Sequence, residues 1–182
     1  MLTAKQSLGI VFDDMGQCAA GRLPPMQTGW HALVGMVFGG SLLALAWIDW
    51  RTHLLPDILT LSLGAAGFLI TWLAEPTFLV DHLIGATAGL GILTALIHVY
   101  RLARHRDGLG GGDAKLLGAI GAWVGWQGLP TVMVYAALSG LAWVLIGALR
   151  GRSLRLDTRL PFGPWLCLGG WLVWLYGPLV LG

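Results

Sequence analysis

The most informative stretch of this sequence is Gly108-Leu-Gly-Gly-Gly-Asp113-Ala-Lys115, in which one acid follows four glycines within five residues. Residues 116–123 come next without a polar break and are apolar enough to enter a bilayer. Asp113 is therefore expected at the boundary between water and hydrocarbon. Placing an ionisable side chain there costs free energy, so such a residue indicates a function. The glycines carry no Cβ, so the backbone can take unusual conformations or another extended chain can approach closely. Both properties suit a site that accepts a peptide.

Composition predicts a membrane protein. Hydrophobic residues make up 56% of the 182 residues, charged residues only 11%, and tryptophan occurs ten times, which is far from the balance of a soluble domain. At about 20 residues per span, the chain has room for five or six transmembrane helices and no large soluble domain. Asp13 and Asp14 interrupt the only apolar run near the start, so no signal peptide is expected. The expected fold class is all-α, a polytopic integral membrane protein.

Apolar runs predict about six transmembrane helices within a membrane-embedded domain at 30–182, preceded by a peripheral lead-in at 1–29. The fourth run covers only about 16 Å as a helix, roughly half the hydrocarbon thickness. This short segment is therefore tilted, continuous with the residues beyond it, or re-entrant. The expected segments are 30–48, 58–74, 82–100, 116–126, 129–149 and 161–181.

The distribution of charge predicts the orientation. Nine of the eleven Lys and Arg residues follow the first, third and fifth segments. The positive-inside rule places these loops in the cytoplasm and both termini outside. Asp49, Asp57 and Asp113 then lie at helix ends on the cytoplasmic side, at similar membrane depth. The nine cations are Arg51, Arg101, Arg104, Arg106, Lys115, Arg150, Arg152, Arg155 and Arg159.

Two of these acids could form a catalytic pair. Asp49 ends one segment and Asp113 precedes another, and two carboxylates brought together do not both ionise at low cost, so they would share a proton. In such a pair the ionised carboxylate takes a proton from water while the protonated one polarises a peptide carbonyl. Neither a metal nor a covalent intermediate is needed. The spacing shows only that the two acids share a depth.

Three stretches in order resemble a known family. Gly108-Leu-Gly-Gly-Gly-Asp113 looks like the GxGD motif of type IV prepilin peptidases, and Asp49-x6-Pro56-Asp57 looks like that family's other aspartate motif. Leu160-Pro161-Phe162-Gly163-Pro164 is similar to a third family segment, so the resemblance runs from about residue 30 to the C-terminus. It implies a membrane aspartic endopeptidase with Asp49 and Asp113 as its catalytic pair.

The resemblance also implies partners and a location. The substrates would be type IV prepilins or type II secretion pseudopilins, whose basic leaders are cut after a glycine. The site would face the cytoplasm in the bacterial inner membrane, with membrane lipid as the other partner. Many bacterial members carry a methyltransferase module with paired CxxC motifs; none occurs in this sequence, so a peptidase-only form without N-methylation is expected.

Five further residues are expected to bind substrate or support the site. They include an ionisable pair, Lys115 and Asp57. Lys115 would tune the pKa of Asp113 or bind a lipid phosphate. Asp57 comes directly after Pro56 and suits the first turn of a helix, where the helix dipole is positive. The other three are the glycines Gly108, Gly110 and Gly112.

Plainer interpretations stand beside these. Asp113 could cap a helix beginning at Ala114, and Asp49 could simply mark the end of a span. A catalytically silent homologue that acts as a pilin-assembly factor would keep the fold, although both aspartates are intact. A small proton- or ion-coupled transporter with Asp113 in the ion path is a further alternative, but the sequence shows no convincing internal repeat.

No cofactor or metal is expected. The five histidines are scattered without the i, i+4 pairing of a zinc protease helix, and Cys18 and Cys167 are too few for a four-thiolate zinc site or a disulfide framework. Asp113 replaces the third glycine of a GxGxxG dinucleotide turn. Neither a nucleotide nor a nucleic acid is therefore expected as a partner.

Overall fold

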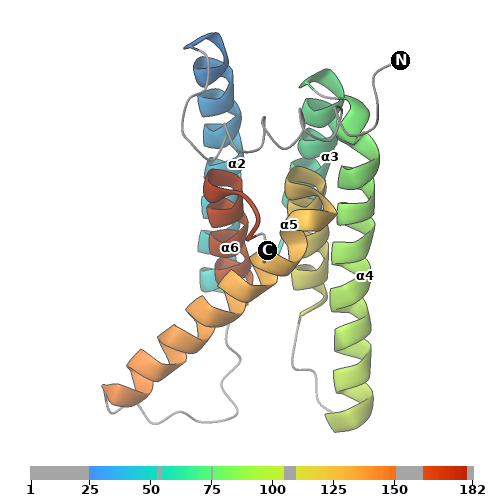
Figure 1. Ribbon diagram of the computed structural model, residues 1–182. Coiled ribbons are helices and arrows are strands. Elements are labelled where there is room, and N and C mark those ends of the chain that lie inside the picture. Colours follow the sequence, from blue (N-terminus) through green and yellow to red (C-terminus); the bar gives the residue numbers. More distant parts are fainter. Residues whose placement is uncertain (1–24, 53–54, 75, 105–109, 151–161, 180–182) are drawn as a thin grey trace. The chain divides into compact units, whose positions relative to one another are not determined.

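The computed structural model describes residues 25–52, 55–74, 76–104, 110–150 and 162–179, and every regular element in these ranges is helical (Figure 1). Four helical stretches there are long and apolar enough to cross a membrane. The all-α, multi-pass membrane class is therefore confirmed. The elements in chain order are α2 (Pro25–Thr52), α3 (Asp57–Ala74), the 3-10 helix η1 (Pro76–Phe78), α4 (Leu79–Arg104), α5 (Gly111–Leu149) and α6 (Gly163–Tyr176).

Two compact units divide the chain inside α2, at Met1–Val37 and Phe38–Gly182. Of the first unit, only the beginning of α2 is described, and it starts at Pro25. Proline suits the first turn of a helix because the N–H it lacks would have no partner there. The expected lead-in falls largely outside the described residues. The second unit contains every described candidate site residue.

α5 contains a sharp break at Gly125. The backbone angles there are φ 69° and ψ 176°, a region open essentially to glycine alone. Figure 1 shows the yellow first arm and the orange second arm of α5 leaving this break like the two arms of a V. At 1.5 Å per residue the arms are ~21 Å and ~36 Å long. The expected short segment is thus continuous with the next helix; it begins at Gly111 rather than 116, and no loop separates it from the second arm.

Polar groups at the start of α4 lie beside the break. His82 Nδ1 lies 2.9 Å from the carbonyl oxygen of Ala122, three residues before Gly125, where regular helical hydrogen bonding ends. Because a carbonyl only accepts, Nδ1 must carry the donated proton. Trp126 Nε1 donates to Asp81 Oδ1 at 3.2 Å. An unsatisfied carbonyl is expensive in an apolar environment, so these contacts stabilise the break.

α6 is shorter than the sixth span expected at 161–181. It has 14 residues, or ~21 Å, which is less than the hydrocarbon thickness. Pro164 lies in its first turn, and Gly177, the C-cap that follows Tyr176, has φ 78° and donates its N–H to the Val173 carbonyl at 2.9 Å. Pro178 follows and cannot continue a helix. The expected count of about six spans is therefore not confirmed.

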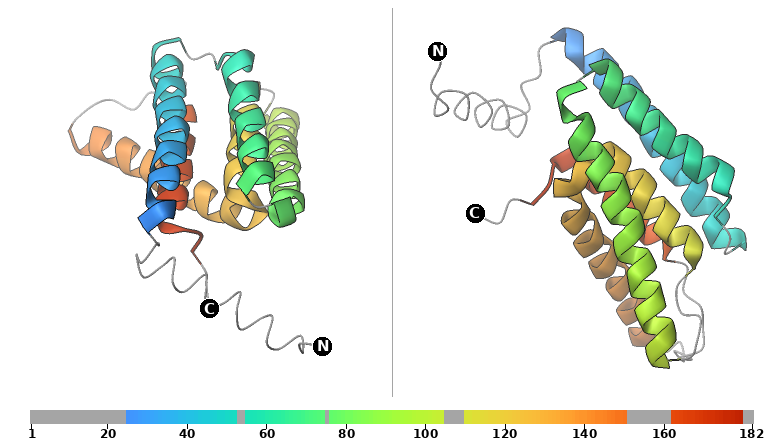
Figure 2. Two further views of the ribbon diagram at one scale, coloured as in Figure 1. Left: turned by 90° about the horizontal axis from the view of Figure 1, so that it is seen from above. Right: turned by 90° about the vertical axis from the view of Figure 1, so that its right-hand side faces the viewer.

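Glycines bring α4 against the first arm of α5. A Cβ added at Gly85 would lie 2.5 Å from the Gly121 carbonyl oxygen, and one at Gly89 would lie 2.7 Å from that of Leu117. Small residues of this kind let helix backbones approach closely in membranes, where packing provides much of the attraction between helices. Both views in Figure 2 show α3 and α4 beside the yellow first arm. The first arm, which carries Asp113, is consequently held from several sides.

An aromatic cluster joins α2, α5 and α6 within the second unit. Phe38 stacks on Trp123 with ring centroids 4.5 Å apart and lies 5.5 Å from Trp174. Trp123 also donates its indole N–H to the Leu63 carbonyl of α3 at 2.7 Å. The Trp123 ring also lies 5.7 Å from that of Trp174 on α6, so Trp123 connects the first arm to α2, α3 and α6.

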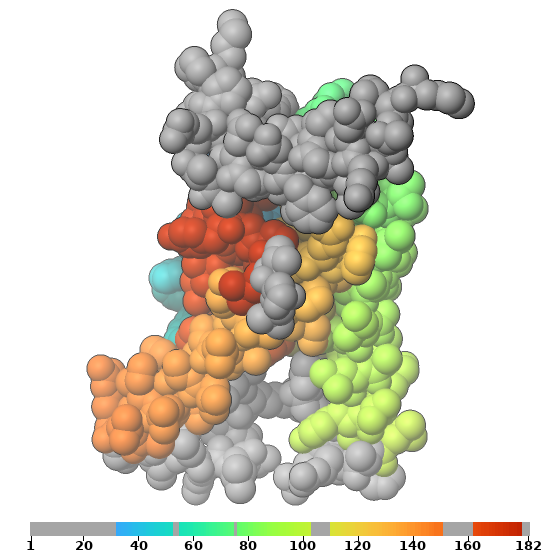
Figure 3. Space-filling model, viewed as in Figure 1, coloured from blue at the N-terminus to red at the C-terminus, as the bar shows by residue number. Residues whose placement is uncertain are grey.

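The outer surface of α4 and of the second arm is apolar. Figure 3 shows both on the visible face. Exposed side chains of this size and kind suit contact with lipid chains, not water. They include Leu83, Ile92, Leu96 and Val99 on α4 and Leu141, Leu145 and Leu149 on α5.

Candidate active site

Asp113 is buried in the first turn of α5. The helix begins at Gly111 with Gly110 as its N-cap, so Asp113 is the third helical residue. The simple capping role at a helix beginning at Ala114 does not apply. The Asp113 N–H donates to the Gly110 carbonyl at 3.1 Å, and the side chain is only 7% exposed.

Asp49 is buried in the last turns of α2 and lies against the start of α6. Its side chain is 5% exposed. A Cβ added at Gly163, the first residue of α6, would lie 2.5 Å from Asp49 Oδ2 and 3.0 Å from its Cγ. Only glycine leaves room for the carboxylate there. The first turn of a helix also favours a negative charge, because its N–H groups lack helical partners.

The two carboxylates lie within range of each other's charge. Both charges also act on the thiol of Cys167, a buried residue of α6. α2 and α5 thus each contribute one acid, and α6 begins against the acid from α2. Two such acids can share one proton and act together on a water molecule and a carbonyl group.

Gly112 lies against Leu55, in the segment just before α3. A Cβ at Gly112 would lie 3.0 Å from the Leu55 Cβ and 3.2 Å from its Cδ1. A side chain of this chain therefore occupies the space that the sequence suggested for a substrate. At Gly111, in contrast, no described atom lies within 4 Å of the position of an added Cβ. Gly110 is exposed, and Gly108 lies outside the described residues.

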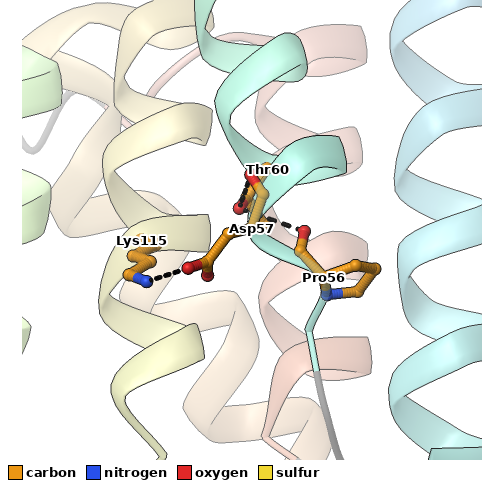
Figure 4. Close-up of polar contacts among 4 residues, drawn as sticks. All are labelled: Pro56, Asp57, Thr60 and Lys115. Atoms are coloured by element: carbon orange, nitrogen blue, oxygen red, sulfur yellow. Dashed lines mark hydrogen bonds and ion pairs between the residues drawn. The ribbon is translucent and has the colours of Figure 1, made fainter.

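Lys115 and Asp57 form an ion pair. The Lys115 Nζ lies 2.6 Å from Asp57 Oδ2, and Figure 4 shows the two side chains meeting between the first turns of α5 and α3. The Lys115 side chain is 44% exposed and that of Asp57 57%. Asp57 is the first residue of α3, as the sequence suggested. The sequence did not predict its partner.

Sequence reasoning missed three features of this site: the contact of Gly163 with Asp49, the buried Cys167 within electrostatic range of both acids, and the packing of Leu55 on Gly112. The glycine between Phe162 and Pro164 could have signalled the first of these. The first position of a helix normally tolerates a side chain, so a glycine there suggests that another group packs closely against it. Nothing in the sequence marks the other two. No group of three or more His, Cys, Asp or Glu side chains suited to a metal occurs among the described residues.

Comparison with known proteins identifies the family. Residues 36–145 match the profile described as Type IV leader peptidase family. The chain is 41% identical over 152 residues to the "Prepilin leader peptidase/N-methyltransferase" of Aeromonas hydrophila, covering 84% of this chain and 52% of the relative. It is 40% identical over 163 residues to the protein of the same name from Escherichia coli (strain K12), covering 87% and 70%.

A third relative with this name, from Pectobacterium carotovorum subsp. carotovorum, is 46% identical over 151 residues, with 81% of this chain and 51% of the relative covered. The chain spans about half the length of most of the relatives that it matches. No solved structure matches it significantly. Because the family profile covers more than half of its residues and relatives match most of its length, the chain belongs to the type IV leader peptidase family.

Proposed function

We propose that this protein is a membrane aspartic endopeptidase that removes the leader peptide from type IV prepilins or type II secretion pseudopilins. The observation that carries the proposal is the burial of Asp49 and Asp113 within range of each other's charge. Family membership supports the choice of substrate, because the relatives are named prepilin leader peptidases. The proposal concerns leader cleavage alone.

In the proposed mechanism the two carboxylates share one proton. The ionised carboxylate takes a proton from water, and the resulting hydroxide attacks the carbonyl carbon of the scissile peptide bond. The protonated carboxyl donates a hydrogen bond to the carbonyl oxygen. When the tetrahedral intermediate collapses, the C–N bond breaks and the leaving nitrogen takes a proton from the pair. The burial of both acids excludes bulk water and strengthens these interactions.

The proposed location is the inner membrane of a bacterium, with the site facing the cytoplasm. Asp49 lies near the end of α2, and Arg51 follows it two residues later. The positive-inside rule assigns such basic helix ends to the cytoplasm. The proposed substrates carry basic leaders. Membrane lipid is the other proposed partner, because the outer surface of α4 and of the second arm of α5 is apolar.

In the proposed site, Gly110, Gly112, Lys115 and Asp57 support Asp113. Gly110 is the N-cap of α5, Gly112 lets Leu55 pack against the first turn, and the ion pair fixes the same turn. Gly111 keeps its side of this turn free of side chains, which suits an extended peptide. Gly108, outside the described residues, belongs to the proposed site by its place in the motif alone.

The proposal is tested by cleavage of a prepilin-like substrate in liposomes, read as a mobility shift and checked by the sequence of the new N-terminus. The variants are Asp49→Asn and Asp113→Asn. Asp81→Asn is the matched control because it removes a charge near the opposite end of the first arm while its amide oxygen can still accept from Trp126. We expect each site variant to lose at least about a thousandfold in rate, with thermal unfolding unchanged. Cleavage surviving either change would refute the assignment, and a wild type inactive on several substrates would refute the function.

A further inference from the structure

We infer that the Asp57–Lys115 ion pair positions the Asp113 carboxylate, by tying the first turn of α3 to the first turn of α5. This inference rests on the proposed peptidase function. Lys115 lies two residues after Asp113 in the same turn, and its Nζ is 2.6 Å from Asp57 Oδ2 (Figure 4). A displacement of this turn would therefore move the contact and the acid together.

The α3 side of the contact is rigid. Pro56 precedes the helix, and its carbonyl accepts the N–H of Leu59 at 3.1 Å and that of Thr60 at 3.3 Å. The buried Thr60 hydroxyl also donates to the Asp57 carbonyl at 3.0 Å. The backbone that carries Asp57 is thus fixed by a proline ring and by three hydrogen bonds of the first turn.

A second contact holds the same turn of α5 from the same segment. Leu55 packs on Gly112, the residue directly before Asp113. Gly112 and Lys115 flank Asp113, and both contact residues 55–57. This short segment follows the end of α2, and Asp57 comes eight residues after Asp49 in the chain. The clamp formed by Leu55–Gly112 and Asp57–Lys115 therefore links the segment that precedes α3 with the turn that bears Asp113.

The pair acts on the rate more than on stability. Half-exposed ion pairs contribute little to the free energy of unfolding, because solvent screens them. A reacting group displaced by about 1 Å, in contrast, can lose about a hundredfold in rate. Removing the pair should consequently lower kcat while the protein stays folded, and KM should change little because neither side chain is required to touch substrate.

The test compares Asp57→Asn, Lys115→Met and the charge exchange Asp57→Lys with Lys115→Asp, using the cleavage assay above. We expect each single variant to lose about tenfold in kcat, with KM and the unfolding temperature nearly unchanged, and the exchange to recover most of this loss because it restores the attraction. Asp81→Asn and Arg150→Met are matched controls, since each removes one charge at a distance from the clamp, and both should keep the wild-type kcat.

Three results would overturn the inference. Single variants with wild-type kcat would show that the contact positions nothing. An exchange no better than the single variants would show that each charge acts separately, for example Lys115 directly on the acids or on lipid. Losses that follow a fall in unfolding temperature would reduce the pair to a structural role. An inactive wild type would refute the proposed function. The clamp would then be tested by a measurement that does not depend on cleavage.

That measurement is the distance between spin labels at Thr52→Cys on α2 and Gly111→Cys on α5, in a Cys18→Ser background. We expect Lys115→Met to broaden the distance distribution and the charge exchange to narrow it again. A distribution that stays the same in Lys115→Met would overturn the inference whether or not cleavage is seen.

Discussion

At the scale of single residues, the site depends on glycines, whose lack of a side chain leaves room for neighbouring groups. Gly163 leaves the space that Asp49 occupies, and Gly112 leaves the space that Leu55 occupies. The glycines around Asp113 thus serve two purposes: one brings a neighbouring segment close, while Gly111 stays open on its side. The GxGD motif singled out Asp113 as a candidate site residue. The structure adds that Gly112 of this motif packs against Leu55 of the same chain.

The first prediction concerns Gly163→Ala. The new Cβ would lie 2.5 Å from Asp49 Oδ2, so either the carboxylate or the start of α6 must move. We expect a loss of at least about tenfold in cleavage rate, because a reacting group is displaced, while the helical content measured by circular dichroism is retained. Gly91→Ala on α4 is the matched control, because no described atom lies within 4 Å of its added Cβ. Equal rates in the two variants would show that the contact with Gly163 does not place Asp49.

At the scale of elements, the break in α5 is the feature that separates what the sequence predicts from what it does not. The apolar runs predicted a short segment followed by a long one, separated at Gln127 and Gly128. The position of the break at Gly125 depends instead on His82 and Asp81, which come from another helix. With many glycines in this region, local sequence cannot indicate which of them adopts a positive φ.

The second prediction concerns His82→Ala. Loss of the ring leaves the Ala122 carbonyl without its 2.9 Å contact in an apolar environment, which costs about 1–3 kcal/mol in the free energy of unfolding. We expect a fall of several degrees in the thermal unfolding temperature in detergent. His98→Ala, an exposed histidine on the same helix, is the matched control and should leave this temperature unchanged. A His82→Ala protein as stable as wild type would mean that the break does not need this contact.

At the scale of the whole molecule, composition and charge predicted the membrane class, and the motif order predicted the family. The proposed pairing of Asp49 with Asp113 could not be derived from spacing, because it depends on how α2, α5 and α6 pack. The number of helices that cross the whole membrane could not be predicted from the apolar runs either. Gly177-Pro178 ends α6 early, and only the geometry at Gly125 shows that residues 111–149 do not form a straight helix.

The last prediction follows from this geometry. A straight α5 of 39 residues would be ~58 Å long and would place its two ends on opposite sides of the bilayer. The two arms of the V-shaped α5 leave the break toward the same end of the molecule (Figure 1), so both ends of α5 are expected on one side of the bilayer. The sides can be read with a membrane-impermeant maleimide on vesicles of known orientation, using single cysteines at Thr52, Thr77 or Arg150 in a Cys18→Ser background, where Cys167 is buried.

We expect Thr52→Cys and Arg150→Cys to react from the same side and Thr77→Cys, between α3 and α4, to react from the other. We expect the shared side to be the cytoplasmic one, because basic residues lie at the ends of α2 and α5. If Arg150→Cys reacted together with Thr77→Cys, α5 would cross the membrane as a single span. The end of its second arm would then lie on the opposite side from Asp113, and the positive-inside assignment of the basic residues after Leu149 would be wrong.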